Sequence, residues 1–124
     1  ATTDVGDLLV ARGFMSGQNS STHGYISGGS TTSTFAFTDT IDKFPFATHG
    51  TATDVGNLSV ARGSGITAGQ SSTTDGYACG GRALPAPAYP IQSVIDKFSF
   101  ASNGNAANIG SLTVARYGSA SQQY

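Results

Sequence analysis

A nine-residue segment that occurs three times limits how this chain can fold more than any other feature. The copies are residues 4–12 (DVGDLLVAR), 54–62 (DVGNLSVAR) and 108–116 (NIGSLTVAR). They are spaced by roughly fifty residues, a period typical of repeat arrays in which each unit is one supersecondary structure. The sequence therefore predicts a modular architecture over the whole chain.

Two further blocks recur in the same order between the copies of this segment. GYISGG at residues 24–29 matches GYACGG at 76–81, and IDKFPFA at 41–47 matches IDKFSFA at 95–101. Aligning the three blocks divides the chain into two whole repeats and two partial ones. We expect one repeat array over residues 1–124, made of the last strand of a preceding repeat (1–12), repeat 1 (13–62), repeat 2 (63–116) and the start of a third repeat (117–124).

The repeated blocks have the pattern of short β-strands. In the first copy of the nine-residue segment, Leu8 and Val10 fall on one face while Asp7 and Leu9 fall on the other. This period of two is the one expected of a strand. About four such segments fit into each repeat, separated by glycine-containing turns and without a helical period. The fold class we predict is all-β, with about four antiparallel strands per repeat and no significant helix.

Paired glycines close the first strand block of each repeat, as Gly28-Gly29 and Gly80-Gly81. Glycine allows close backbone approach and positive φ angles, which crowded inner strands require.

A variable segment follows each glycine pair, at residues 30–39 and 82–92. The second is rich in proline and contains Tyr89, so we expect an exposed loop there, on the edge of the array that binds ligands.

Several acidic residues also recur with the repeat. Asp4 and Asp54 become Asn108 in the third copy, so this position requires a short side-chain acceptor more than a charge. A turn capped through its own backbone has that requirement. The Asp-Lys pairs at residues 42–43 and 96–97 are expected on an exposed strand edge, where ion pairs contribute about 0–1 kcal/mol.

The order of these signals resembles a kelch-type repeat. That repeat has an apolar strand ending in Gly-Gly (residues 25–29), a variable loop (30–39), an aliphatic-acid-base-aromatic strand (41–44) and a terminal segment ending in Ala-Arg (55–62). The resemblance covers essentially the whole chain and implies kelch-like propeller blades, two full ones with partial flanking repeats. Where the family usually has a tryptophan, three residues before the leucine of the last strand, this chain has Val5, Val55 and Ile109.

The kelch resemblance also implies a role for the arginine that ends each nine-residue segment. Arg12, Arg62 and Arg116 would be structural, donating hydrogen bonds to loop carbonyls between blades, with the glycine pairs on the inner strands. The chemistry agrees, because a guanidinium carries five N–H donors in a fixed fork. The sequence is similar, in addition, to kelch-like repeat proteins among bacteriophage virion proteins and related surface proteins.

The chain carries little charge, which restricts its partners. Charged residues make up 10% of the sequence, glutamate is absent and the net charge is −1. Nucleic acids and anionic membranes require clustered Lys and Arg, so we expect neither as a partner. No apolar run reaches the length of a membrane span, so we expect no membrane insertion. Solubility through Ser, Thr and Gly is typical of β-proteins at the virion surface or outside the cell, where we expect this chain.

No group of side chains in the sequence has the spacing of a catalytic or metal site. His23 and His49 are isolated, and Asp75 replaces His23 in repeat 2. Metal sites need several ligands at compatible spacing, and catalysis needs a nucleophile beside a base. We therefore expect no enzyme activity, no metal and no cofactor. Cys79, the single cysteine, is expected to be a small buried side chain.

Candidate ligand contacts are few. Tyr89 in the proline-rich loop is the candidate for stacking on a glycan, with His23 and Asp75 as further candidate contacts. Asn19 and Asn57 match the short N-glycosylation pattern Asn-x-Ser.

We expect a non-enzymatic structural or adhesive β-repeat module of a virion or extracellular appendage. Further repeats or other copies of the chain would complete it, because a ring of blades usually needs four to eight. One alternative is a subunit of an extracellular filament assembled head to tail by strand pairing. The other alternative is a carbohydrate-binding propeller that uses its rim loops.

Overall fold

The structure is a computed structural model that describes residues 1–31, 36–63, 68–85 and 88–118. Every helix or strand element within these ranges is a β-strand, and all strand pairings are antiparallel. The all-β prediction is therefore confirmed. The described strands form open sheets and close no barrel or ring. None of the described residues belongs to a helix with the length and apolar character needed to cross a membrane.

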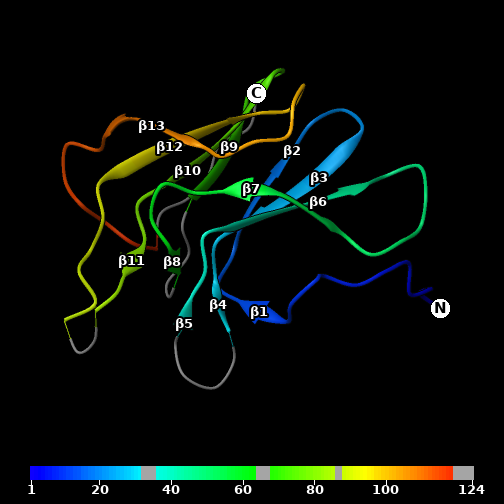
Figure 1. Ribbon diagram of the computed structural model, residues 1–124, viewed down its shortest axis with the longest axis horizontal. Helices are drawn as coiled ribbons and strands as arrows, with labels where there is room; N and C mark the ends of the chain where they lie inside the picture. The colour runs from blue at the N-terminus through cyan, green and yellow to red at the C-terminus, as the bar shows by residue number, and fades with distance from the viewer. Residues whose placement is uncertain (32–35, 64–67, 86–87, 119–124) are drawn as a thin grey trace.

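Two four-stranded sheets form the body of the chain (Figure 1). The first sheet contains, in spatial order, β2 (Ser16–Asn19), β3 (His23–Ser27), β6 (Thr40–Pro45) and β7 (Thr53–Asn57). The second sheet contains, in the same order, β9 (Ala68–Ser71), β10 (Asp75–Cys79), β12 (Val94–Ser99) and β13 (Ala107–Ser111). Each recurring sequence block thus occupies the same place in its sheet.

The two sheets agree in register as well as in order. Tyr25 lies opposite Lys43 in the first sheet, as Tyr77 lies opposite Lys97 in the second. The pairing of the third strand with the fourth shifts register just before Asp42 and, in the second sheet, just before Asp96. Matching positions therefore have matching environments wherever the same neighbours are present.

Two small sheets lie at one end of the large ones. One contains β1 (Arg12–Gly13), β4 (Ser30–Thr31) and β5 (Ala36–Phe37). The other contains β8 (Arg62–Gly63) and β11 (Arg82–Ala83). Both begin at the arginine that ends a nine-residue segment.

The glycine pairs have the backbone conformation that the sequence predicts. Gly28 and Gly29 have φ angles of 65° and 111°, and Gly80 and Gly81 have φ angles of 69° and 95°. They follow β3 and β10, which are interior strands of their sheets. The Gly29 amide donates to the carbonyl of Arg62 at 2.9 Å, so the pair also anchors the end of the nine-residue segment.

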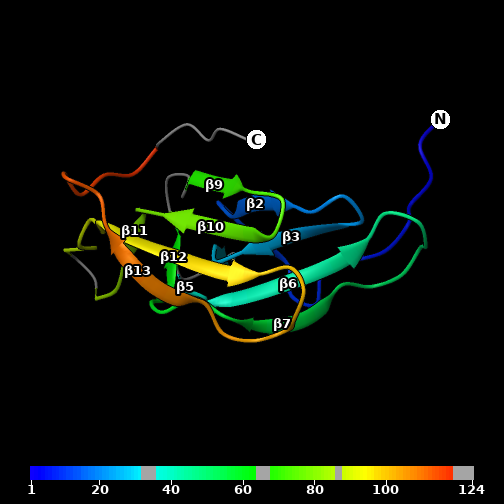
Figure 2. The ribbon, with the colours of Figure 1, turned by 90° about the horizontal axis from the view of Figure 1, so that it is seen from above.

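The two large sheets pack against each other with β2 beside β9 (Figure 2). The core between them contains Tyr25 and Ile41 from the first sheet and Ala78 and Phe98 from the second, with Leu58 from the chain after β7. The ring of Tyr25 lies 5.6 Å from that of Phe98, between centroids. The sheets are held together largely by this apolar cluster.

Candidate functional site

The junction between the sheets contains a fully buried ion pair. Arg62 Nη1 donates to Asp96 Oδ2 at 2.8 Å, and both side chains have 0% exposure. Arg62 Nη2 donates to the carbonyl oxygen of Ala78 at 2.8 Å. Asp96 also accepts from the amide and the hydroxyl of Ser59, at 2.9 and 2.6 Å. Such charge-assisted bonds offset the cost of removing both ions from water.

The same junction recurs at the other side of the first sheet. Arg12 Nη2 lies 3.1 Å from Asp42 Oδ2 and donates to the carbonyl oxygen of Ile26 at 3.3 Å. Asp42 and Ile26 hold the positions in the first sheet that Asp96 and Ala78 hold in the second. The N-terminal segment therefore approaches the first sheet as residues 54–62 approach the second.

The two copies differ at the position of Ser59. Leu9 stands there in the first copy and has no hydroxyl. Both carboxylate oxygens of Asp42 are buried without a well-aligned hydrogen bond from any described residue. Arg12 and the Leu9 amide lie near enough to stabilise the carboxylate charge. Burial raises the pKa of Asp42, and Asp54 adds to that rise, whereas Arg12 and the Leu9 amide oppose it. The first junction is less well satisfied than the second.

The third arginine, Arg116, accepts the same backbone hydrogen bond from a glycine pair, but its side chain is exposed. The carbonyl of Arg116 accepts from the Gly81 amide at 3.0 Å, as the carbonyl of Arg62 accepts from the Gly29 amide. The side chain of Arg116 is exposed, and its Nε donates only to Val114 O among the described residues, at 3.3 Å. Thr113 stands at the position of Ser59.

The structure thus corrects the sequence-based interpretation in two ways. Asp42 and Asp96, expected on an exposed edge, have 0% exposure and carry the junctions. The carbonyls that Arg12 and Arg62 contact lie in strands β3 and β10 instead of loops. Sequence reasoning treated each Asp-Lys pair locally, because the arginine partner of Asp96 lies 34 residues away. The recurrence of the acid with the arginine was the available signal.

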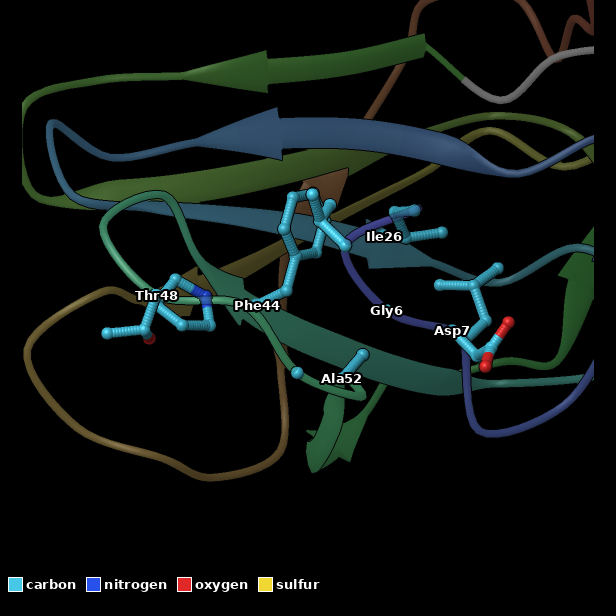
Figure 3. A pocket seen from close by; sticks show the side chains of 10 residues that line it. Gly6, Asp7, Ile26, Phe44, Thr48 and Ala52 are labelled. Atoms are coloured by element: carbon cyan, nitrogen blue, oxygen red, sulfur yellow. The ribbon is translucent and has the colours of Figure 1, made fainter. Parts of the chain in front are cut away.

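A cavity of about 210 Å³ lies between the N-terminal segment and the first sheet (Figure 3). Figure 3 shows Ile26 and Phe44 on the sheet side, and Gly6 and Asp7 on the side of the N-terminal segment. Besides Pro45, the apolar lining residues are Val5, Leu8, Ile26, Phe44 and Ala52. Their counterparts in the repeat are the core residues Val55, Leu58, Ala78, Phe98 and Ala106. The cavity therefore has the walls of the core but lacks the counterparts of Tyr25 and Ile41.

Those counterparts are present on the far face of the second sheet. Tyr77 and Ile95 match Tyr25 and Ile41 by register. Tyr25 is 3% exposed and Ile41 0%, whereas Tyr77 and Ile95 are only partly buried. The far face carries the side chains that the cavity lacks.

The inner strands are joined by a buried amide that sequence reasoning did not single out. Gln18 Nε2 donates to the hydroxyls of Ser16 and Ser27, at 2.8 and 3.0 Å, and to the carbonyl oxygen of Tyr77 at 3.0 Å. The last bond crosses from the first sheet to the second. The GQ dipeptide that recurs within β2 and β9 was the available signal.

The candidate ligand residues do not converge on one site. Asp75 lies 3.8 Å from Lys97 Nζ, and His23 Nδ1 lies 2.8 Å from the Thr22 hydroxyl. His23 and Asp75 begin β3 and β10, so they occupy matching turns of different sheets. The ring of Tyr89 lies 5.8 Å from that of Phe37 between centroids, so Tyr89 packs against strand β5. No group of three potential metal ligands is present among the residues that the structure describes.

The remaining sequence-predicted residues have defined places. Asn19 is partly buried at the end of β2, and Asn57 ends β7. Cys79 is buried, as expected, and burial raises the pKa of its thiol. Residues 119–124, expected to begin a third repeat, lie outside the described residues.

The predicted bond from a short side-chain acceptor to the neighbouring backbone is present at all three copies, although Asp54 and Asn108 lie within strands β7 and β13 instead of in turns. Asp4, Asp54 and Asn108 each use Oδ1 to accept the amide of the glycine two residues later, at 3.1, 3.0 and 3.0 Å.

No family model matches the chain, and no curated protein matches its sequence.

Proposed function

We propose that this chain is a non-enzymatic structural module of kelch-like blades, in which successive four-stranded sheets stack through one recurring junction. The observation that carries the proposal is the repetition of the arginine-aspartate contact. The pair Arg12–Asp42 joins the N-terminal segment to the first sheet, and the pair Arg62–Asp96 joins the next copy of that segment to the second sheet. A contact that recurs at the period of the repeat is a contact for stacking units.

Stacking also follows from the distribution of apolar surface. A sheet that carries apolar side chains on both faces must cover both, and repeat units do so by packing on their neighbours. The first sheet has one face covered by the second sheet, while no sheet among the described residues covers Tyr77 and Ile95, which are partly buried. A further unit of the same kind would complete the array.

The use of the ionisable groups supports a structural role. Asp96 is engaged by Arg62 and Ser59, and Asp42 by Arg12. The raised pKa of Cys79 favours the neutral thiol, which is a poor nucleophile. The buried charges and the thiol thus support packing between sheets.

We place the module in a virion or extracellular appendage. The low charge of the chain and its solubility through Ser, Thr and Gly support that location. Immunoelectron microscopy with an antibody to the chain should label particles or fibres outside the cell. Labelling confined to the cell interior would contradict the location.

Stacking is tested by lengthening the array. A chain carrying a second copy of residues 63–116 after Arg116 should unfold in one transition at a higher temperature, because Arg116 then meets an aspartate and Tyr77 becomes buried. The matched control carries alanine at the counterpart of Asp96 in the added copy and should lose much of the gain. Two separate transitions, or an unchanged Tm, would contradict stacking.

A further inference from the structure

We infer that the far face of one chain docks on the first sheet of a second copy, where residues 107–116 take the place held by residues 3–12. This inference rests on the proposed function, since it names the partner of the open face. The surface consists of Tyr77, Ile95, Gly110, Thr113 and Arg116. Its receptor consists of Asp42 and the wall of the cavity that remains when residues 3–12 leave, which includes Ile26, Phe44 and Ala52.

The N-terminal segment already mimics the outer strand of a neighbouring sheet. The amides of Gly50 and Ala52 donate to the carbonyls of Val5 and Asp7, at 2.8 and 2.9 Å. At the junction inside the chain, the amides of Gly104 and Ala106 donate to Val55 and Asn57, at 2.7 and 2.8 Å. Residues 5–7 thus occupy on the first sheet the place that residues 55–57 occupy on the second.

The segment at β13 is the third version of this strand, and it has the better side chains for the receptor. Asp42 is fully buried, and neither of its carboxylate oxygens has a well-aligned hydrogen-bond donor among the described residues. Leu9, at the position of Ser59, offers no hydroxyl. Thr113 carries a hydroxyl at that position, and its counterpart Ser59 bonds Asp96 at 2.6 Å. Docking would give Asp42 the hydroxyl and guanidinium partners that Asp96 already has.

The sheet-side wall of the cavity is the receptor for the apolar part of the far face. The cavity has the walls of the core without the tyrosine and isoleucine, and Tyr77 and Ile95 are the same two residue types in the same register. Among the residues that the structure describes, Phe46 has no stacking partner of the kind that its counterpart has. Phe46 is 55% exposed, whereas the ring of Phe100 stacks on Tyr25 with 4.8 Å between centroids. Docking would cover Phe46 with Tyr77.

The segment that must leave is held weakly in comparison. Val5, Leu9 and Val10 are 51%, 49% and 53% exposed even in their seats on the first sheet. The counterparts of Val5 and Val10, Val55 and Val60, are partly buried, and Leu8 is only partly buried where its counterpart Leu58 is 5% exposed. Displacing residues 3–12 therefore uncovers little apolar surface, and the docked strand covers more.

Substitution of Gly110 should affect docking without affecting the fold. A Cβ at Gly6 would overlap the carbonyl of Gly50, and a Cβ at Gly56 would overlap the carbonyl of Gly104. A Cβ at Gly110 meets nothing within 4 Å in the chain as it stands. In the docked pair, Gly110 would lie against the Gly50 carbonyl of the second copy. Gly110→Ala should therefore leave the fold intact and block docking.

Sedimentation velocity over a range of concentrations tests the inference. Wild type should associate as concentration rises, and Gly110→Ala should remain monomeric with an unchanged Tm. Gly104→Ala is the matched control, because a Cβ there also meets nothing within 4 Å, and it should associate like wild type.

The hydroxyl is tested by a second pair of variants. Thr113→Val should weaken association about tenfold or more, because Asp42 would stay unsatisfied in the docked pair. Thr113→Ser keeps the hydroxyl and should associate like wild type. Leu9→Ser should act in the opposite sense, since it improves the resident segment and so suppresses association.

Two outcomes overturn the inference. One is association that Gly110→Ala leaves unchanged, which means that another surface or partner site is used. The other is a wild-type chain that stays monomeric at every concentration, which removes the second copy as the occupant. Neither outcome touches the lengthened-array experiment, so failure of docking and failure of stacking are distinguishable.

Discussion

Arg62 and Asp96 lie 34 residues apart in the chain and form a buried ion pair, with Nη1 and Oδ2 separated by 2.8 Å. The carbonyl of Arg62 accepts from the Gly29 amide of the first repeat, and its side chain donates to Asp96 and Ala78 of the second sheet. One residue thereby joins both units. The junction is an interaction between repeats, which is why its strength is open to measurement by single substitutions.

Arg62→Ala should lower the free energy of unfolding by about 3–5 kcal/mol, because it leaves Asp96 buried without its counter-charge. Urea denaturation followed by circular dichroism measures this. Arg116→Ala is the matched control at an exposed arginine and should leave the monomer's stability unchanged. Equal losses for the two variants would show that the buried pair has no special weight.

Ser59→Ala should destabilise the chain by about 1.5–3 kcal/mol, since the Ser59 hydroxyl donates to the buried carboxylate of Asp96. Thr113→Ala removes a hydroxyl at the matching position, which is exposed in the monomer. It should have no effect on monomer stability in the same urea titration. A loss at Thr113 as large as at Ser59 would contradict the assignment.

Tyr25→Ala should cost about 3–5 kcal/mol, as expected for deleting a buried aromatic ring from a core. Tyr77→Ala makes the same change at the matching but partly exposed position and should cost clearly less. Thermal unfolding of both variants at a concentration where the chain is monomeric gives the comparison. Similar costs would mean that Tyr77 is already packed as Tyr25 is.

Asp42 should make the chain respond to acid in an unusual direction. Burial raises its pKa in the folded state above 3.8, the ordinary value for an aspartate, so the folded state binds the proton more tightly than the unfolded state. This group therefore adds stability as pH falls through its folded pKa towards 3.8 and removes it as pH rises. Asp42→Asn has no titrating group at this position and so lacks this contribution to stability.

The measurement is the free energy of unfolding of wild type and Asp42→Asn between pH 7 and pH 4. Wild type should gain on the variant as pH falls, whatever the other carboxyl groups contribute to both. Leu9→Ser supplies a hydroxyl to the Asp42 carboxylate and should reduce the gain. Parallel pH profiles for wild type and Asp42→Asn would contradict the raised pKa.

Much of the local structure followed from the sequence. The recurring blocks indicated that the same order of strands repeats, but the alternation inside the nine-residue segment misplaced one strand. β7 ends at Asn57 and β13 at Ser111, so residues 58–60 and 112–114 lie beyond them, and residues 4–11, expected to form a strand, form none. The side-chain bonds to neighbouring backbone at Asp4 and Asp54 and the positive φ angles at Gly28 and Gly80 did follow, since each depends on contacts within a few residues. None of these required knowledge of which sheets meet.

The environment of each copy was decided by the tertiary structure alone. Arg12, Arg62 and Arg116 end nearly identical segments, yet only the first two have an aspartate beside them among the described residues. Asp42 and Asp96 were expected in solvent and proved buried, because their partners come from another unit. Sequence determined the repeated segment and its local bonds. Packing between sheets determined what each copy does, since strand pairing, burial and ion pairing depend on neighbours distant in the chain.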